Sequence, residues 1–265
     1  QALSQALHRM AGGDFTSRAA PRMAVRWRDE IVDLGQDFDR MAERLQHATE
    51  SQRALLHDVS HELRSPLARM QAAIGLLRQN PAAGAAMIDR IEAESGKLDA
   101  LIEELLALHR LDAGAARSPA ERVDLVELLH AIVEDAGFEA EAAGKRVTLD
   151  AGESFIAPVQ GELVYRAFEN VIRNAVKYSP AGGAAEVAAR VTAEDTLEVR
   201  VADRGPGVPP ELQQRIFDPF FRVEQGGRAG GTGLGLAIAH RAVALHGGRI
   251  RAASREGGGL VVMIE

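Results

Sequence analysis

The chain has 265 residues and a formal net charge of −7, and charged residues make up 26% of it. An acidic chain of this kind is not expected to bind nucleic acid through bulk electrostatics. It has no cysteine, which excludes a disulfide framework and a thiolate metal site. No apolar run reaches the roughly 20 residues of a membrane-spanning helix. Because the sequence enters mid-pattern at Gln1, we expect it to be a fragment of a longer protein.

The first part of the chain has the spacing of long helices. After a short helical piece within residues 1–20, apolar residues recur from Ile31 to Ala48 in alternating steps of three and four, the a/d pattern of a coiled coil. Between Leu55 and Leu67 the step becomes four, and the 3-4 spacing then returns. Extra residues in a heptad locally unwind a supercoil, so we expect a packing irregularity on this turn.

A second helix is expected after a break at Asn80-Pro81, with apolar residues from Ile88 to Leu105 and an end near Asp112. Two helices in a hairpin cannot bury both apolar faces alone. Pairing two hairpins gives a four-helix bundle, so we predict a homodimer through residues 51–113. The alternative is a plain coiled-coil dimeriser that carries an unrelated surface histidine.

The stretch HDVSHELRSPL at 57–67 breaks this helical pattern with a proline. Pro66 lacks a backbone N–H and is expected to kink the helix. The polar residues just before it are His61, Glu62, Arg64 and Ser65. Position 65 follows His61 by one turn, so both lie on one helix face.

After a predicted linker at 114–122, the pattern changes to mixed elements over residues 123–265. The predicted helices are at 124–142, 161–177, 210–217 and 233–246. The predicted strands are at 145–150, 185–193, 196–203, 249–254 and 260–264. Strand hairpins mixed with helices favour an α+β sandwich over a doubly wound parallel sheet. The predicted fold is therefore an all-α dimerisation region followed by an α+β domain.

Two polar clusters of the second domain have the chemistry of a nucleotide site. Asn170 and Asn174 leave one helix face, and their amides suit a hard cation and phosphate, with Lys177 and Tyr178 following. Such a pair on a helix is more often solvated surface. Asp203 ends a strand before Gly205 and Gly207, where a carboxylate can accept a hydrogen bond from an exocyclic amine. The alternative for Asp203 is a turn cap.

Two further clusters come later in the chain. IFDPFFRV at 216–223 carries three phenylalanines, which often fill a core edge, and Arg222, a candidate phosphate contact. GGTGLGLAIAH at 230–240 places Gly231, Gly233 and Gly235 before an apolar helix, whose free N–H groups suit an anion. This spacing is neither a Walker loop nor GxGxxG. A flexible linker is the alternative.

In order and spacing, these clusters resemble a bacterial sensor histidine kinase of two-component signalling. HELRSP is similar to the family's H-box, ENVIRNAVKYS to the N-box, and DRGPGVP to the first glycine box. IFDPFFR is similar to the F-box and GGTGLGLAI to the second glycine box. GGDF and RDEIVDLGQDFDRMAERL resemble the second half of a HAMP module, over residues 1–50, and FEAEAAGKRV is closest to Cpx-type envelope-stress kinases.

The resemblance implies a Bergerat-type ATP-binding domain and a phosphoacceptor histidine. His61 would accept the γ-phosphate of ATP, and Glu62 would orient or deprotonate its imidazole. Asn170 and Asn174 would hold Mg²⁺. Lys177 and Arg222 would contact phosphates, Tyr178 would pack beside the base and Asp203 would bind the adenine amine. Gly231, Gly233 and Gly235 would let a lid close over the phosphates, and the remaining implied nucleotide contacts are Gly205, Gly207, Phe220, Thr232 and Leu234. Pro66 would give the helix a bending point.

One departure from the family pattern lies at Ser65, where relatives usually have Thr or Asn to position the water that dephosphorylates the partner. Serine keeps the hydroxyl but loses the methyl group that restricts χ1. The resemblance further implies a response-regulator partner, a homodimer, and a cytoplasmic portion of a bacterial inner-membrane protein anchored by an upstream segment. A catalytically degenerate scaffold and a gyrase- or chaperone-type ATPase are the alternatives.

Overall fold

The computed structural model describes residues 30–80, 84–112, 119–223 and 231–265. The predicted helical piece before residue 20 and the GGDF segment lie outside these ranges. The chain divides into two compact units, Gln1–Ser65 and Pro66–Glu265.

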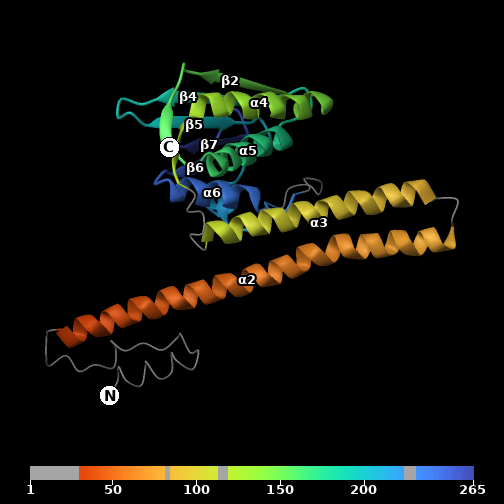
Figure 1. The fold of residues 1–265 in the computed structure, drawn as a ribbon, viewed down its shortest axis with the longest axis horizontal. Coiled ribbons are helices and arrows are strands. Elements are labelled where there is room, and N and C mark those ends of the chain that lie inside the picture. Colours follow the sequence, from red (N-terminus) through yellow and green to blue (C-terminus); the bar gives the residue numbers. More distant parts are fainter. Residues whose placement is uncertain (1–29, 81–83, 113–118, 224–230) are drawn as a thin grey trace. The chain divides into compact units, whose positions relative to one another are not determined.

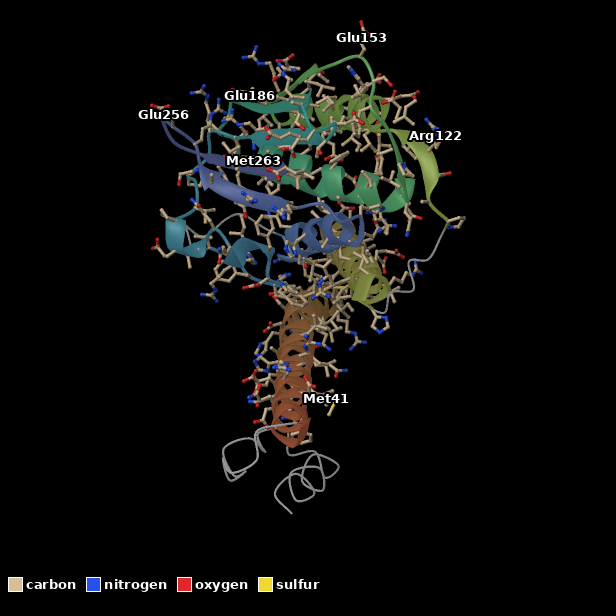
Figure 2. The ribbon with its side chains drawn as sticks, turned by 90° about the vertical axis from the view of Figure 1, so that its left-hand side faces the viewer. Met41, Arg122, Glu153, Glu186, Glu256 and Met263 are labelled. Atoms are coloured by element: carbon tan, nitrogen blue, oxygen red, sulfur yellow. The ribbon has the colours of Figure 1, made fainter. Side chains whose placement is uncertain are left out.

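The first described element is a single long helix, α2, at Glu30–Gln79 (Figure 1). It stays helical through Pro66, so the proline does not end it. Along the predicted heptad, Phe38 is buried while Met41 (Figure 2) and Leu45 are exposed. Within the ranges that the structure describes, no helix is both long and apolar enough to cross a membrane.

Helix α3, at Gly84–Asp112, follows the break predicted at Asn80-Pro81 and ends where the sequence predicted. In the second unit a buried carboxylate ties the two helices together. Glu94 of α3 accepts a hydrogen bond of 3.0 Å from Arg69 of α2 and one of 2.8 Å from Lys97. Several apolar side chains of this hairpin remain about half exposed in the single chain: Leu67, Ile74, Ile88 and Ile102.

The C-terminal part of the second unit is built on a five-stranded mixed sheet. Its order is β2-β4-β5-β7-β6, with β2 parallel to β4 and the other pairs antiparallel. The strands are β2 Arg146–Ala151, β4 Ala184–Val191, β5 Leu197–Ala202, β6 Ile250–Ser254 and β7 Leu260–Ile264. A separate antiparallel pair joins β1, Glu121–Asp124, to β3, Ile156–Val159.

Helices α4 Leu125–Ala142, α5 Gly161–Tyr178 and α6 Gly235–Leu245 pack together over one face of this sheet (Figure 1). Strand residues on the helix side are buried, as in the cross-strand pair Val187 and Val201. Residues on the other side, such as Glu186 and Met263, are less buried (Figure 2). This two-layer arrangement confirms the predicted α+β sandwich after a helical region.

Two details of the prediction are wrong. The single helix predicted at 210–217 is two short 3₁₀ helices, at Pro210–Leu212 and Arg215–Phe217. Prolines bracket this segment, and Asp218, which precedes Pro219, takes an extended conformation that ends helical structure. The strands β1 and β3 were not predicted, because four-residue strands, one of them containing Pro158, show too little alternation.

Candidate functional site

A cavity of about 700 Å³ opens in the second unit between α5, the end of β5 and the start of α6. Most of the side chains and glycines that the sequence singled out in this domain line its wall: Asn170, Asn174, Lys177, Tyr178, Asp203, Gly207, Arg222, Gly231, Thr232, Gly233 and Gly235. Segments separated by tens of residues along the chain therefore meet at one concave surface.

Helix α5 places the two asparagines. It buries one face in the domain core: Val164, Ala167, Phe168, Val171, Ile172 and Ala175. Asn170 and Asn174 lie one turn apart beside this face, half-buried, and line the cavity. The core packing thus holds two amide groups at the cavity wall, and they are not the solvated surface pair of the alternative reading.

The glycine-rich segment before α6 lies against α5. A Cβ added at Gly235 would stand 2.8 Å from Oδ1 of Asn170, and one at Gly231 would collide with Nζ of Lys177. Gly233 has a positive φ of 78°, and an added Cβ there would lie 2.9 Å from Cα of Phe220. Glycine is required at Gly233, where the backbone of Phe220 approaches too closely for a side chain, whereas at Gly231 the flexible Lys177 side chain would have to move.

Asp203 is buried at the end of β5, with only 4% of its surface exposed. Its Oδ1 accepts hydrogen bonds from the N–H of Gly205 at 2.7 Å and of Leu260 at 3.3 Å. Burial raises the pKa of Asp203, and the two backbone hydrogen bonds oppose this rise. Among the described residues, no hydrogen bond to Oδ2 is seen, which leaves this oxygen as a buried acceptor for a donor in the cavity.

Two cationic side chains, Lys177 and Arg222, also line the cavity. The pKa of Lys177 is lowered, first by burial and then by the neighbouring guanidinium of Arg222, while Glu104 opposes the shift. The Lys177 ammonium also lies 5.0 Å from the ring centroid of Tyr178. Two cations held close together favour an anionic ligand, which relieves their mutual repulsion.

Helix α3 contributes Ala100 and Glu104 to the same wall. The hydroxyl of Thr232 donates a hydrogen bond to a carboxylate oxygen of Glu104. The pKa of Glu104 is raised, chiefly by burial, and the hydrogen bond from Thr232 opposes the rise. The segment before α6 is thereby tied to α3 in this structure.

Three residues that the resemblance implied as nucleotide contacts do not line the cavity: Gly205, Phe220 and Leu234. Gly205 instead allows the chain to pass Tyr178, whose carbonyl oxygen would lie 2.5 Å from an added Cβ. Phe220 has φ of 61° and donates its N–H to the carbonyl of Gly233 at 3.0 Å. Leu234 is fully buried. Their nucleotide-binding role stays a prediction, and the contacts seen are structural.

Sequence reasoning missed Lys145, Glu104 and Arg173, which also line the cavity. Lys145 donates hydrogen bonds to the carbonyls of Val176 at 2.8 Å and Lys177 at 2.9 Å, so it caps the last turn of α5. A single lysine between a predicted helix and a predicted strand does not indicate a contact with the end of a distant helix. Only the motif FEAEAAGKRV, which contains it, drew attention to this segment.

The H-box residues from His61 to Ser65 lie on α2 in the first unit. His61, Arg64 and Ser65 are exposed, and Glu62 is half-buried. The ring of His57, one turn earlier, lies edge-on to the ring of His61, with 4.5 Å between centroids. An exposed imidazole next to a carboxylate is available both to a reacting group and to solvent.

The cavity fits a nucleotide with a magnesium ion better than a self-contained metal site. Among the described residues, no group of three histidine or carboxylate side chains could hold a metal ion. Two amide oxygens from Asn170 and Asn174 are too few ligands for Mg²⁺ alone, so they would hold the ion only together with phosphate oxygens of a bound nucleotide.

Three family models match the chain in succession. The HAMP domain model matches residues 1–47 and the His Kinase A (phospho-acceptor) domain matches residues 51–114. The model of the histidine kinase-, DNA gyrase B- and HSP90-like ATPase matches residues 160–265.

Similar whole proteins are sensor kinases. Sensor histidine kinase CpxA of Escherichia coli K12 is 36% identical over 239 residues, 89% of this chain and 51% of CpxA. The signal transduction histidine-protein kinase BaeS of the same strain is 32% identical over 268 residues, 97% of this chain and 55% of BaeS. The chain thus spans about half the length of these curated relatives.

The solved structure of full-length ShkA in complex with AMPPNP is 27% identical, with a TM-score of 0.59 over 80% of this chain and 45% of that one. The order of the three matched domains, the sequence relatives and this fold agree. The chain belongs to the family of two-component sensor histidine kinases.

Proposed function

We propose that this chain is the kinase portion of a sensor histidine kinase, which transfers the γ-phosphoryl group of ATP to His61 and then to an aspartate of a response regulator. The observation that carries the proposal is the buried Asp203 at the wall of a cavity that also holds Asn174 and Lys177. The same chain carries an exposed histidine on α2.

The cavity wall carries groups that suit both parts of ATP. The open oxygen of Asp203 suits the adenine amine, and Tyr178 lies on the same wall to pack beside the base. Lys177 and Arg222 suit the phosphates, since both are cationic and lie near each other. A purine triphosphate satisfies the buried acceptor and the paired cations together.

In the reaction, an imidazole nitrogen of His61 attacks the γ-phosphorus, the bond from that phosphorus to the β,γ-bridging oxygen breaks, and ADP leaves. Glu62, the neighbouring carboxylate, accepts the proton from the other ring nitrogen. Asn170 and Asn174 would hold Mg²⁺, which offsets the charge that develops on the phosphate oxygens. Arg64 lies within the same exposed turn and would steer the anionic group toward it.

The helical hairpin supports the homodimer. Leu67, Ile74, Ile88 and Ile102 are each between 40% and 48% exposed in the single chain. A second hairpin would cover them in a four-helix bundle, which accounts for apolar spacing on both helices. The same bundle would present His61 and Ser65 to the regulator, and the Ser65 hydroxyl would position the water in the reverse, phosphatase reaction.

We further propose that this chain is anchored to a membrane. A HAMP domain at the start of the chain supports a membrane segment upstream of it and a cytoplasmic position for the kinase. A catalytically degenerate scaffold is disfavoured, because the polar residues needed for nucleotide and magnesium are present together at the cavity wall.

Incubation with γ-labelled ATP and Mg²⁺, followed by an acid treatment of the labelled protein, tests the activity directly. We expect an acid-labile label that is absent in His61→Gln and present in His130→Gln, which removes an exposed histidine of the second domain. Label that survives acid, or that persists in His61→Gln, contradicts the assignment of His61.

The magnesium part has its own test. Asn174→Ala should remove the Mg²⁺-dependent component of ATP binding in calorimetry, while the melting temperature without nucleotide changes little, since the side chain is half-buried at the cavity wall. Equal ATP affinity of this variant and the wild type in Mg²⁺ would contradict the proposed role.

A further inference from the structure

We infer that His57 and His61 form a two-imidazole clamp on α2 for a late transition-metal dication such as Cu²⁺, Ni²⁺ or Zn²⁺, and that the bound ion excludes phosphorylation of His61. The second half of this inference rests on the proposed function. The binding of the ion does not.

The spacing of the two histidines supplies the first argument. Residues four apart on a helix are neighbours on one face, and two histidines in this arrangement can bind one metal ion together. The rings of His57 and His61 are already in contact, with centroids 4.5 Å apart and an angle of 62° between their planes. The clamp therefore starts from two rings that are already neighbours on one face of α2.

The centroid distance supplies the second argument. A metal–nitrogen bond of about 2.1 Å places two imidazoles at a right angle on one ion with their centroids roughly 4.5 Å apart, and a tetrahedral angle places them roughly 5.3 Å apart. The observed separation of His57 and His61 is that of the right angle. Adjacent sites at a right angle belong to the tetragonal geometry of Cu²⁺ and Ni²⁺, and Zn²⁺ adapts to a wider angle.

The availability of the rings supplies the third argument. Both histidines are exposed, and among the described residues neither ring has a hydrogen bond or ion pair with the protein. Their nitrogens are thus open to solvent and to an ion. Each histidine is followed by a carboxylate, Asp58 or Glu62, which adds negative charge near the ion.

The site would have only two protein ligands, because the described residues contain no group of three that could hold a metal. Water would complete the coordination, so the ion would exchange readily. Imidazole binds late transition metals, and its affinity rises from Ni²⁺ to Cu²⁺. Mg²⁺ prefers oxygen ligands. The magnesium used with ATP therefore does not compete for this clamp.

Metal binding and phosphorylation use the same electron pair. An imidazole nitrogen that coordinates an ion cannot also attack phosphorus, and a phosphorylated ring nitrogen cannot coordinate. A bound ion therefore lowers the rate of phosphorylation of His61, and phosphorylation of the coordinating nitrogen removes that nitrogen from the clamp.

Direct binding of Cu²⁺ to the full chain tests the clamp without any kinase assay. Electron paramagnetic resonance at one equivalent of Cu²⁺ should show coupling to two imidazole nitrogens in the wild type and to one in His57→Ala. Calorimetry should give at least a tenfold weaker affinity for His57→Ala and for His61→Ala. His130→Ala is the matched control, since it removes an exposed histidine outside the pair and should leave binding unchanged. Equal affinity of wild type and His57→Ala overturns the inference.

Inhibition of autophosphorylation by Zn²⁺, with ATP held as its Mg²⁺ complex, tests the consequence. Each protein is compared with its own metal-free rate, and His57→Ala should need at least ten times more Zn²⁺ for half inhibition than the wild type. Equal inhibition of both proteins overturns the exclusion. A wild type that binds Cu²⁺ through two imidazoles but takes up no phosphate without metal contradicts the proposed function and leaves the clamp intact.

Discussion

Gly235 lies directly against the side chain of Asn170, and a methyl group at position 235 would stand 2.8 Å from the Oδ1 atom of that asparagine. The first turn of α6 therefore has room for the proposed magnesium ligand only because residue 235 has no side chain. The contact joins two motifs that are far apart in the sequence, and it makes the glycine a determinant of the site.

Gly235→Ala should weaken ATP binding in Mg²⁺ at least tenfold, about 1.4 kcal/mol, because the added methyl displaces the Asn170 amide. The melting temperature of the variant without nucleotide should equal that of the wild type, since alanine favours the helix that begins at this position. Calorimetric titration with ATP and Mg²⁺ measures the first effect.

Gly137→Ala is the matched control for this change. Gly137 lies inside α4, and a Cβ there meets nothing within 4 Å. This variant should keep wild-type ATP affinity and gain about 0.5–1 kcal/mol in the free energy of unfolding. An equal loss of affinity in both variants would show that Asn170 is not involved.

Asp203→Asn should weaken ATP binding and narrow the preference for ATP over GTP, because the carboxylate is replaced by an amide that can present a donor to the adenine amine. The backbone hydrogen bonds from Gly205 and Leu260 can still reach a side-chain oxygen, so the variant should fold. Competition binding of the two nucleotides measures the ratio, and an unchanged ratio would leave Asp203 as a turn cap.

Burial raises the pKa of Asp203, so the ionised carboxylate destabilises the nucleotide-free protein. This destabilisation grows as the pH rises from the pKa of the unfolded state, about 3.9, through the pKa of the folded state. Asp203→Asn removes that charge. Without nucleotide, the free energy of unfolding of Asp203→Asn should therefore increase relative to that of the wild type as the pH rises through this range. Denaturant titrations of both proteins across the acidic range check the sign.

The hydrogen bonds from Arg69 and Lys97 lower the pKa of Glu94 to about 2 from an ordinary value of 4.5. A lowered folded pKa stabilises the hairpin above pH 4.5, and the stabilisation is lost as the pH falls from there toward 2. Glu94→Gln should cost about 1–2 kcal/mol at neutral pH, a modest amount because Arg69 and Lys97 are solvent-screened.

The difference in melting temperature between Glu94→Gln and the wild type should shrink as the pH falls through this range, which circular dichroism can follow. Glu92→Gln is the control, since Glu92 is exposed on α3 and has no ion pair among the described residues. A cost for Glu94→Gln that does not change with pH would show that the effect is steric.

Pro66→Ala should raise the thermal stability of α2, because alanine supplies the N–H that proline lacks and the helix already runs through this position. If Pro66 provides a bending point, the ratio of autokinase to phosphatase activity should change more than the affinity for ATP. Gly75→Ala is the control: it raises helix propensity in α2, where a Cβ meets nothing within 4 Å, without removing the proline. Equal shifts of the ratio in both variants would assign the effect to helix stability.

The sequence by itself determined the features that depend on neighbours along the chain. The periodicity of apolar residues indicated α2 and α3, and the break at Asn80-Pro81 separated them, because helix formation responds to local spacing and to proline. The polar motifs with their glycines indicated a phosphate-binding domain before any contact was known. The α+β class followed from strand hairpins mixed with helices.

Only the tertiary structure decided which of these residues share a wall. The contact between Gly235 and Asn170, the open oxygen of Asp203 and the approach of Glu104 from α3 all join distant segments. Such contacts depend on how buried helix faces pack over the sheet, which no local pattern encodes. For the same reason β1 and β3 were not predicted. Each four-residue strand is defined by its hydrogen-bonded partner strand and not by its own sequence.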